Sequence, residues 1–567
     1  MPFRAPVADQ SFILTHVAPL APVSATERFA DASADLAQEI LASAGRLADE
    51  VLAPLNRAGD KTPARLENGV VRTSPGFAAG YRAIAEGGWV GMAAAPDLGG
   101  MGLPMALTAA VGETFAGANL ALQLNPLLTQ GQIEALEHHA ADDLKALYVP
   151  RLASGEWTGT MNLTEPQAGS DVGALTSRAE PAEDGSFRIT GQKIFITWGD
   201  HDVAANICHL VLARLPDAAP GTRGISLFLV PKFLPDAAGQ PGQRNSLRVV
   251  SLEHKLGLHG SPTCVMSFED ATGFIVGGPG KGMAAMFTMM NNARLGVGMQ
   301  GVGIAEAATQ AALAYAKERR QGATGRPGPG TIIDHADVRR MLATMRAETF
   351  SARALALDCA VAIDMGRATD EPHWLARAAL LTPLAKAFGT DIGNEVAQMG
   401  IQVHGGMGFI EETGAAQFAR DVRVTSIYEG TNGIQAMDLV GRKMADGGEA
   451  AFRLIDEVQK GAEAARAIHP DLAGDVWSAS ETLRDATETL LAQPMDDRFA
   501  GAVPYLRGFA RVMSGHFHLK AALADPARQP LARVAIRRLL PEHAALLSAA
   551  REGADGLFAV SPEALES

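Results

Sequence analysis

The spacing of hydrophobic positions divides the chain into a helical, a strand-like and a second helical region. Apolar residues recur at helical intervals in Ala30–Leu52, Met105–Ala116 and Ile133–Leu152, so residues 27 to 155 are predicted to be mainly helical. A glycine-rich stretch, Asp97–Pro104, interrupts this pattern and is predicted to be a loop.

From about Thr158 the pattern changes to the alternation that is typical of strands. Short apolar runs are bounded by turn residues, which favours a small antiparallel sandwich or barrel. The predicted strands are Phe187–Thr197, Ile207–Ala213, Ile225–Val230, Leu247–Leu252 and Thr263–Phe268.

Helical spacing returns between about Met283 and Met444, and Asp446–Gly448 marks a linker to a further Ala/Leu-rich region. The predicted fold class is therefore α+β, with several domains. We expect an N-terminal arm (1–35), an N-terminal helical domain (36–157), a central antiparallel β-sandwich or barrel domain (158–275), a catalytic helical bundle (276–445) and an additional C-terminal helical domain (446–567). No Gly-x-Gly-x-x-Gly motif follows an early strand, which argues against a Rossmann domain.

Composition narrows the class of protein. The 567 residues are too many for one hydrophobic core, and a hydrophobic content of 47% excludes wholesale disorder. The net charge of -14 argues against nucleic acid as a partner. Only three cysteines occur, which fits a reducing compartment better than a disulfide framework or a zinc site. The sequence shows no uninterrupted apolar run of membrane-spanning length, and we expect a cytoplasmic protein with a structural N-terminal arm.

Four segments have the residue types of a ligand-binding site. In Thr164–Asp171, Pro166 and Gly169 favour a tight loop whose N–H groups and hydroxyls could cradle an anion or a polar ring. Lys193–Gly199 places aromatic and hydroxyl side chains at a strand end, where a planar cofactor could stack. Taken alone, the first segment is better explained by an ordinary loop and the second by a core strand with an aromatic side chain.

The other two segments lie in the second helical region. Gln402–Phe409 has three glycines within four residues, which permit close approach of the backbone to a ligand, or simply a helix–helix turn. Arg319 and Arg320 at a helix end suit a diphosphate, and equally suit a helix C-terminus that faces solvent.

Glu429 is the candidate catalytic residue. Ile427 and Tyr428 precede it, and their bulk could exclude water and raise the pKa of the carboxyl toward neutrality. A general base that takes a proton from carbon needs such a pKa. A solvated loop carboxylate is the ordinary alternative, and His404 is a second titratable candidate.

In this order the segments resemble the acyl-CoA dehydrogenase family of flavoproteins, over roughly residues 80 to 445. The resemblance implies that Glu429 is the catalytic base and that Gly430 and Arg294 lie at an acyl-CoA substrate. It implies FAD as the cofactor. The implied FAD-binding residues, some of which would act across a subunit interface, are Thr164, Ser170, Phe195, Thr197, Arg319, Gln321, Gln402, Gly405, Gly406 and Thr431.

Three positions depart from the family pattern. Gly322 stands where many relatives have Phe, Gly433 where many have Gln, and Asn291 where Asp is frequent. Gly322 is therefore expected to change the packing around the FAD adenosine, and Gly433 to remove one side-chain contact to the cofactor. Asn291 is expected to alter the usual contact to CoA. The arm and the region after Asp446 resemble the long subgroup of the family, which has a C-terminal helical extension.

The implied reaction is α,β-desaturation of an acyl-CoA thioester to a trans-2-enoyl-CoA, with electrons passed to an electron-transfer flavoprotein. The acyl group, fatty or methylthio-substituted, is left open, and a homodimer is expected, with a tetramer as the alternative. There are three alternatives: an acyl-CoA oxidase that uses O2, a DNA-associated flavoprotein relative, and a helical scaffold without FAD. A small basic stripe for DNA would be Arg533, Arg537 and Arg538.

Overall fold

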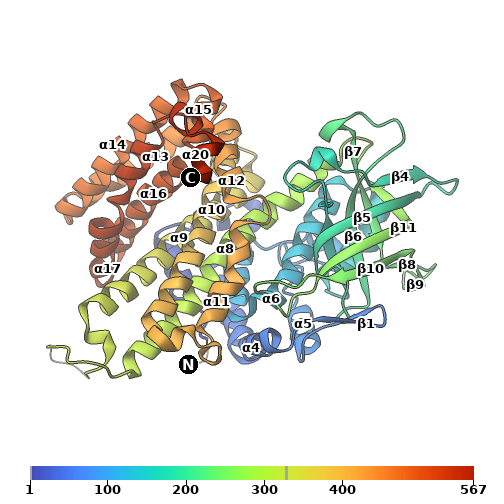
Figure 1. Ribbon diagram of the computed structural model, residues 1–567, viewed down its shortest axis with the longest axis horizontal. Helices are drawn as coiled ribbons and strands as arrows, with labels where there is room; N and C mark the ends of the chain where they lie inside the picture. Colours follow the sequence, from blue (N-terminus) through green and yellow to red (C-terminus); the bar gives the residue numbers. More distant parts are fainter. Residues whose placement is uncertain (1–2, 326–329) are drawn as a thin grey trace.

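The computed structural model describes residues 3–325 and 330–567, and places a β domain at one end of the molecule and helices at the other (Figure 1). The predicted arm begins with Met1 and Pro2, which lie outside the described residues. The predicted fold class, helical regions before and after a central β domain, is confirmed.

The N-terminal region is helical, and its longest helix is bent. α6 is kinked at Asn119, whose backbone leaves the helical conformation and whose side-chain oxygen accepts from the Leu122 N–H at 3.1 Å. The predicted helix Ile133–Leu152 is two helices, because Ala140 is extended. The elements are α1 (Val7–His16), α2 (Ala21–Ser24), α3 (Ala34–Leu47), α4 (Ala53–Lys61), β1 (Arg65–Glu67), β2 (Val70–Arg72), α5 (Phe77–Glu86), α6 (Met105–His139) and α7 (Asp142–Ala153), with single turns η1 (Glu27–Phe29), η2 (Ala48–Leu52) and η3 (Pro96–Leu98).

The β domain is built around a seven-stranded sheet in which all five predicted runs are strands. The order is β10-β11-β5-β4-β6-β3, and β7 pairs with β11 and β6. Most ladders are antiparallel as expected, but β3 and β4 run parallel to β6. The strands are β3 (Trp157–Asn162), β4 (Arg178–Pro181), β5 (Phe187–Thr197), β6 (Asn206–Arg214), β7 (Ile225–Pro231), β8 (Phe233–Pro235), β9 (Pro241–Arg244), β10 (Leu247–Leu252) and β11 (Thr263–Val276), with the turns η4 (Val172–Ala174) and η5 (Gly221–Gly224).

The central bundle brings two long helices into backbone contact. A Cβ on Gly301 would lie 2.2 Å from the carbonyl oxygen of Gly389, and a Cβ on Gly298 would lie 2.7 Å from that of Ala385. Only glycine permits this approach, which fixes the two helices relative to each other. The elements are α8 (Gly282–Glu318), η6 (Ile332–Asp334), α9 (Ala336–Thr369), α10 (Pro372–His404), η7 (Gly405–Phe409), η8 (Glu411–Thr413), α11 (Ala415–Val422), η9 (Arg423–Ser426), α12 (Asn432–Asp438) and η10 (Leu439–Lys443).

The C-terminal helices pack on the bundle of the same chain (Figure 1). Arg511 on α16 is buried and pairs with Glu348 on α9 at 2.7 Å, and Ser514 hydrogen-bonds Ser351 at 2.6 Å. This helical extension is therefore fixed to α9 of the central bundle. Its elements are α13 (Glu449–Ala465), α14 (Pro470–Ala492), α15 (Met495–Ala500), α16 (Ala502–Ala524), η11 (Pro526–Arg528), α17 (Gln529–Val534), η12 (Ala535–Leu539), α18 (Glu542–Ala549), α19 (Asp555–Phe558) and α20 (Pro562–Glu566).

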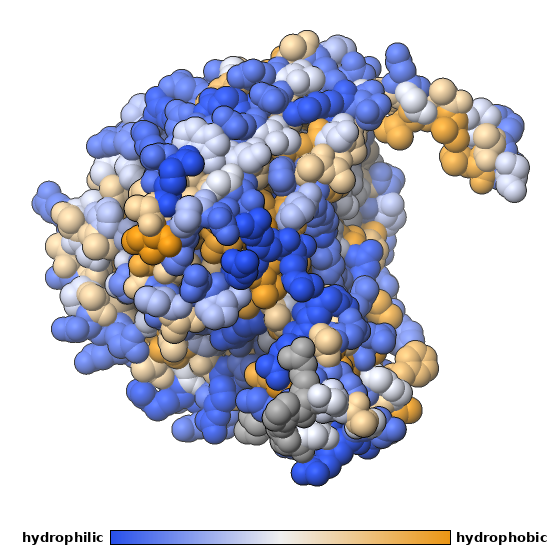
Figure 2. Space-filling model, turned by 90° about the vertical axis from the view of Figure 1, so that its left-hand side faces the viewer, coloured by the Kyte–Doolittle hydropathy of each residue, from blue (hydrophilic) through white to orange (hydrophobic). Residues whose placement is uncertain are grey.

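One described helix, α6, is long and apolar enough to cross a membrane by length and composition alone. Its most apolar window is 94% buried inside the protein, as in the core helix of a folded domain. The side of the molecule in Figure 2 is mostly hydrophilic, with apolar residues in small groups.

Candidate active site

Glu429 lies in a strained turn between η9 and α12. Its φ is +55°, in the left-handed region that costs a non-glycine residue free energy, and Gly430 follows with φ +85°. Thr431 then caps α12, because its hydroxyl accepts the N–H of Ile434 at 3.3 Å. Left-handed backbone held by a capped helix is typical of a functional turn.

The Glu429 carboxylate is shielded but unpaired. The residue as a whole is half-buried, whereas its Oε2 is closed off from water and has no hydrogen-bond partner. Burial raises the pKa of Glu429 to about 7, against the opposing effect of the nearby cations Arg294 and Lys386. A carboxylate with this pKa and a free oxygen is suited to accept a proton near neutral pH.

The shielding does not come from Ile427, and that expectation was wrong. Ile427 is 50% exposed and points away from the core. Tyr428 supplies the shielding instead: it is packed against the main hydrophobic core, and its hydroxyl donates to Gln300 Oε1.

Two buried cations face the turn from the paired helices. Arg294 on α8 is 4% exposed and lies 3.5 Å from Asp438 Oδ2 and 3.4 Å from Asn291 Oδ1. Lys386 on α10 donates to the carbonyl of Gly430 and to Asn432 Oδ1, both at 2.9 Å. Burial lowers the pKa of Lys386 to about 7, although Glu429 opposes this.

Lys386 did not emerge from sequence reasoning. It lies in Leu384–Phe388, a stretch whose apolar members are all buried, and a lone lysine in such a run was the available signal. Its function could not be inferred without knowing that α10 passes behind Gly430.

A Gly430→Ala substitution should disable the turn without unfolding the protein. The added Cβ would lie 2.7 Å from Gln435 Nε2 at a φ of +85°, so the backbone beside Glu429 must shift. We expect kcat/KM to fall about 10- to 100-fold with flavin content unchanged, since small displacements of a catalytic group have effects of this size. Gly433→Ala is the matched control, because its nearest neighbour, Thr431 Oγ1, is 3.8 Å away. Equal activity of Gly430→Ala and wild type would contradict the expectation.

A second set of predicted residues forms one surface on the β domain. The carbonyl of Thr164 accepts the Ile194 N–H at 2.9 Å, which ties the Thr164–Asp171 loop to β5 beside Phe195 and Thr197. Phe195 is 59% exposed with φ +59°, so a strained backbone holds an aromatic face outward. Ser170 is exposed at the far side of the loop. An exposed ring with adjacent hydroxyls fits a planar, polar-edged cofactor such as a flavin.

Glu165 makes this loop rigid. It is buried, and its carboxylate accepts from Lys193 Nζ at 2.8 Å, from the Thr176 N–H at 2.7 Å and from the Ser177 hydroxyl at 2.6 Å. Burial by itself would raise the pKa of Glu165, but Lys193 and these hydrogen bonds bring it down to about 2. The Glu165 carboxylate therefore stays ionised and holds the loop through these hydrogen bonds. It is not a candidate base.

The β-domain surface is linked to the candidate base through α6. Trp198, next to Thr197, donates from Nε1 to the carbonyl of Ala121 at 3.1 Å. Two residues on, Gln123 accepts from Gln300 Nε2 at 2.8 Å, and Gln300 accepts from Tyr428. Thr164, Phe195, Thr197 and Glu429 are thus held by one connected framework, as a shared flavin and substrate site requires.

The remaining predicted residues form a separate group. Arg319 and Gln321 follow the end of α8, and Gln402, Gly405 and Gly406 lie at the end of α10. Tyr315 stacks on His404 at 4.5 Å between ring centroids, so the two helix ends are adjacent. His404 lies 18 residues beyond Lys386 on one helix, about 27 Å along its axis. One chain therefore does not bring these residues to Glu429.

The same distance argues against His404 as the base. Its ring is buried on Tyr315, and its Nδ1 hydrogen-bonds the carbonyl of Gly400 at 2.7 Å. Burial lowers the pKa of His404 below its usual value, as in a structural histidine. Of the departures, Gly322 has φ +72° and space beside the His335 ring, which a Cβ would approach to 3.5 Å.

Comparison with known proteins assigns the chain to a family. The acyl-CoA dehydrogenase N-terminal domain matches residues 35–156, the middle domain residues 160–271 and the C-terminal domain residues 280–444. The chain is 45% identical, over 523 residues, to 3-methylmercaptopropionyl-CoA dehydrogenase of Ruegeria pomeroyi, with 89% of this chain and 88% of the relative covered. It is 37% identical to the broad-specificity linear acyl-CoA dehydrogenase FadE5 of Mycobacterium tuberculosis, covering 81% and 78%.

Solved structures share the fold. The structure of Caenorhabditis elegans ACDH-11 in complex with C11-CoA superposes with a TM-score of 0.81 at 21% identity, covering 95% of this chain and 92% of the other. An acyl-CoA dehydrogenase of Bacillus anthracis complexed with FAD gives 0.75 at 21% identity, covering 92% and 90%. The fold and the three matched domains are those of a flavin-dependent dehydrogenase. The chain belongs to the acyl-CoA dehydrogenase family, whose cofactor is FAD.

Proposed function

We propose that this chain oxidises an acyl-CoA thioester to a trans-2-enoyl-CoA, with Glu429 as the base that takes the α proton. The observation that carries the proposal is the Glu429 Oε2, which is buried, without a partner and on a carboxyl with a pKa of about 7. FAD would be held by Thr164, Ser170, Phe195, Thr197 and Thr431, and when bound it accepts the β hydrogen as hydride.

The turn also supplies a donor for the thioester carbonyl. Within the described residues the backbone N–H of Glu429 donates no hydrogen bond, so it is free to bind the oxygen on which charge develops. One such donor lowers the barrier by about 3 kcal/mol. Lys386 donates to the carbonyl of Gly430 and so anchors the turn one residue beyond Glu429. Arg294 adds a second positive charge near the carboxylate.

The pH profile distinguishes this arrangement from a solvated carboxylate. Glu429 must be ionised to act as a base, so kcat/KM should rise with pH through about 7. Lys386 favours the ionised form, so its removal should raise the pKa of Glu429. A Lys386→Met variant should shift the rising limb to higher pH and lower kcat at pH 7 by roughly tenfold. A lysine that only fills space would leave the position of the limb unchanged.

The acceptor and the assembly are part of the proposal. We infer an electron-transfer flavoprotein as acceptor, as is usual for acyl-CoA dehydrogenases, and a cytoplasmic homodimer. The separation of Arg319 and Gln402 from Glu429 supports a dimer, since a partner could bring this second group to the same FAD. Against DNA, Arg537 of the basic stripe is paired with Asp475 at 3.0 Å and with Asp471 at 3.6 Å.

One anaerobic experiment tests the function. Purified protein is mixed with acyl-CoAs of increasing length and with a methylthio variant, and flavin bleaching is followed before and after an electron-transfer flavoprotein or O2 is added. We expect bleaching by a short acyl-CoA and fast reoxidation by the flavoprotein. Fast reoxidation by O2 with peroxide release would favour an oxidase, and a protein without flavin absorbance would refute the proposal.

A further inference from the structure

The residues that follow Ala554 form a segment that stands away from the body of the molecule, at the upper right of Figure 2. Every residue from Asp555 to Ser567 is exposed, in the short helices α19 and α20 and the turn between them. Among the described residues, no hydrogen bond or ion pair joins this segment to the chain before Ala554. We refer to residues 555–567 as the tail segment.

The tail segment is apolar on one side and acidic on the other, when its residues are placed at helical spacing. It contains no Lys, Arg or His. Helices of four and five residues are not stable in water by themselves, so this segment needs a surface to bind. Its large apolar side chains are Leu557, Phe558, Val560 and Leu565, and its ionisable side chains are Asp555, Glu563 and Glu566.

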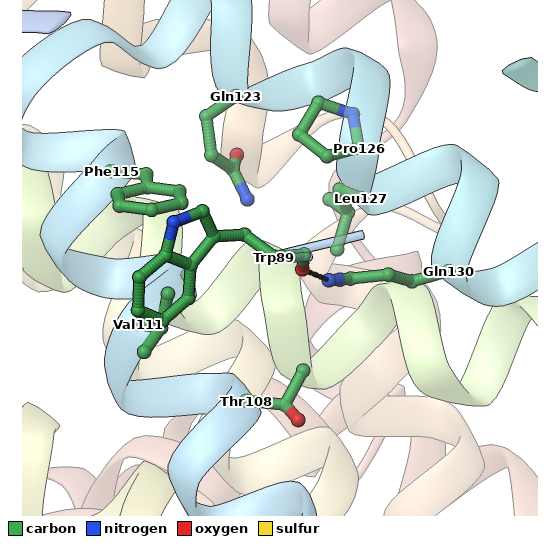
Figure 3. Close-up of a pocket in the computed structure, with 9 residues that line it drawn as sticks. Trp89, Thr108, Val111, Phe115, Gln123, Pro126, Leu127 and Gln130 are labelled. Carbon is green, nitrogen blue, oxygen red and sulfur yellow. Dashed lines mark hydrogen bonds between the residues drawn. The ribbon is translucent and has the colours of Figure 1, made fainter. Parts of the chain in front are cut away.

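The exposure of these apolar side chains contrasts with the close packing inside the same chain. In the kink of α6 the ring of Trp89 meets that of Phe115 edge-on, with 5.8 Å between centroids (Figure 3). The space left beside them is about 10 Å³, roughly that of one water molecule. Phe558, by contrast, is 83% exposed and Leu565 77%. Large apolar side chains gathered on a surface mark an interaction site.

The chain carries a second exposed apolar group around α15. Met495 and Phe499 are one turn apart on this helix and both lie over Gly441, where a Cβ would be 3.8 Å from Met495 Sδ and 3.4 Å from Phe499 Cε1. Met437 lies one turn before Gly441, and all three apolar side chains are more than a third exposed. We refer to Met437, Met495 and Phe499 as the α15 patch.

The tail segment of the same chain leads away from this patch. It starts at Ala554, whose N–H donates to Asp497 Oδ1 at 2.8 Å. Asp497 is two residues from both Met495 and Phe499, which places it about 200° around the helix, on the opposite side of α15. The α15 patch therefore remains open to the tail segment of a second copy.

The charges of the two surfaces are complementary. Arg442 follows Gly441, and its side chain is 63% exposed. Arg498, next to Phe499, donates only to backbone carbonyls and forms no ion pair within the part of the chain that the structure describes. A segment with an apolar side and an acidic side thus meets an apolar patch bordered by cations, and such complementarity favours one partner over others.

We propose that two copies of this chain exchange their tail segments, so that the tail segment of each copy lies on the α15 patch of the other. A two-fold axis makes both contacts at once and closes the assembly. This contact is distinct from the one inferred at the FAD site. Lys386 bonds Asn432 at the start of α12, whereas Gln402 lies 16 residues further along α10, about 24 Å away. Chains that make both contacts form a tetramer.

Sedimentation velocity of the holoenzyme at about 5 µM tests the contact. Phe558→Asp puts a charge into the apolar interface, so the mass should fall to half that of wild type. Ala559→Asp adds the same charge on the acidic side of the tail segment and should keep the wild-type mass. Both residues are exposed within one chain, so flavin absorbance should be unchanged. The halving is expected whether a tetramer becomes a dimer or a dimer becomes a monomer, and so does not depend on the FAD-site contact. A single-chain wild type, or equal masses of Phe558→Asp and wild type, would overturn the proposal.

Disulfide cross-linking identifies the surface that the tail segment covers. A chain with both Phe558→Cys and Met495→Cys is oxidised by copper–phenanthroline in air, and the three native cysteines are buried and contribute little background. We expect covalent dimers in which peptide mapping joins the tail segment to α15. The control pair Phe558→Cys and Met101→Cys, which uses a methionine of similar exposure in the N-terminal region, should remain uncross-linked. A bond within one chain would show that the tail segment covers its own patch, and a halved mass without this cross-link would place the tail segment elsewhere. Either result would overturn the exchange.

Discussion

Replacing Glu429 by Gln should abolish turnover while leaving a folded, yellow protein that still binds acyl-CoA. Gln keeps the size and the hydrogen-bonding oxygen of the side chain but cannot take a proton at neutral pH. Arg294 and Lys386 face Glu429, but Arg294 is held by Asp438 and Lys386 Nζ by the Gly430 carbonyl and Asn432 Oδ1, so neither is placed to replace the base. We expect kcat to fall by roughly 10³- to 10⁴-fold, the range for loss of a general base.

The variant also separates catalysis from stability. Burial raises the folded-state pKa of Glu429 to about 7, above its value in the unfolded chain, so ionising it opposes folding. The protonated Glu429 carboxyl contributes stability that is fully present below about pH 4.5, and this contribution is lost as the pH rises through about 7. The neutral amide of Glu429→Gln carries no buried charge at any pH. The thermal midpoint of this variant should therefore exceed that of wild type most clearly above pH 7.

The measurements are single-turnover flavin reduction and thermal unfolding across pH 5 to 9. Asp391, a neighbouring half-buried carboxylate whose pKa is also raised by desolvation, provides the control. It hydrogen-bonds Asn432 at 2.7 Å and does not lie at the open Oε2, so Asp391→Asn should retain most of the activity. A Glu429→Gln protein with wild-type rates would show that another group takes the proton.

The fold was predictable from the sequence because its signals are local. Alternation marked Phe187–Thr197 and its four companion strands, and helical spacing marked both helical regions. The parallel neighbours of β6 were not predictable. β3 and β4 are short, and their pairing depends on how distant segments return to the sheet. The kink at Asn119 was missed for a similar reason, since an Asn within an apolar helix carries no clear signal.

The site was predictable only where residues cluster along the chain. Glu429 through Thr431 form one turn, and Thr164 lies beside Phe195 through a single backbone hydrogen bond. Lys386 and Gln300 were missed, because they reach the turn from α10 and α8 and depend on side-chain direction. The failure of the Ile427 expectation has the same origin: sequence order shows which residues are neighbours, but not which of them points inward.

The largest effect on stability should come from Arg353, which lies at the centre of a buried ionic network. Its guanidinium is fully buried and lies 2.7 Å from both Glu113 Oε1 and Glu306 Oε2, and 3.5 Å from Asp9 Oδ2. Burial by itself lowers the pKa of Arg353, but the three carboxylates raise it above its usual value. Arg353→Met should lower the free energy of unfolding by roughly 3–5 kcal/mol, because it leaves carboxylates buried without their cation.

Arg346→Met is the matched control. Arg346 also bonds Glu306 and Asp9, at 2.9 and 2.6 Å, but its side chain is 40% exposed. Solvent screens this pair, so its loss should cost no more than about 1 kcal/mol. Thermal unfolding of the two variants measures the difference, and equal losses would contradict a special contribution from the buried guanidinium.

The pH dependence of the loss identifies its cause. Glu113 is fully buried, and burial already raises its pKa although Arg353 opposes this. Without Arg353 the pKa of Glu113 should rise further, so the penalty is largest above that pKa and shrinks as pH falls toward 5 and the carboxyl takes up a proton. If the loss came from a cavity left by the substitution, the free energy of unfolding would fall by the same amount at every pH.

The network further predicts where the Arg353→Met protein opens first. Asp9 lies on the N-terminal arm, and it also accepts from Arg528 of the C-terminal extension at 2.8 Å. The arm, the bundle and the extension therefore meet at one carboxylate. Loss of Arg353 should expose α1 to limited proteolysis at temperatures at which the β domain is still resistant, whereas Arg346→Met should leave α1 protected. Cleavage that begins in the β domain would show that the network does not join the three regions.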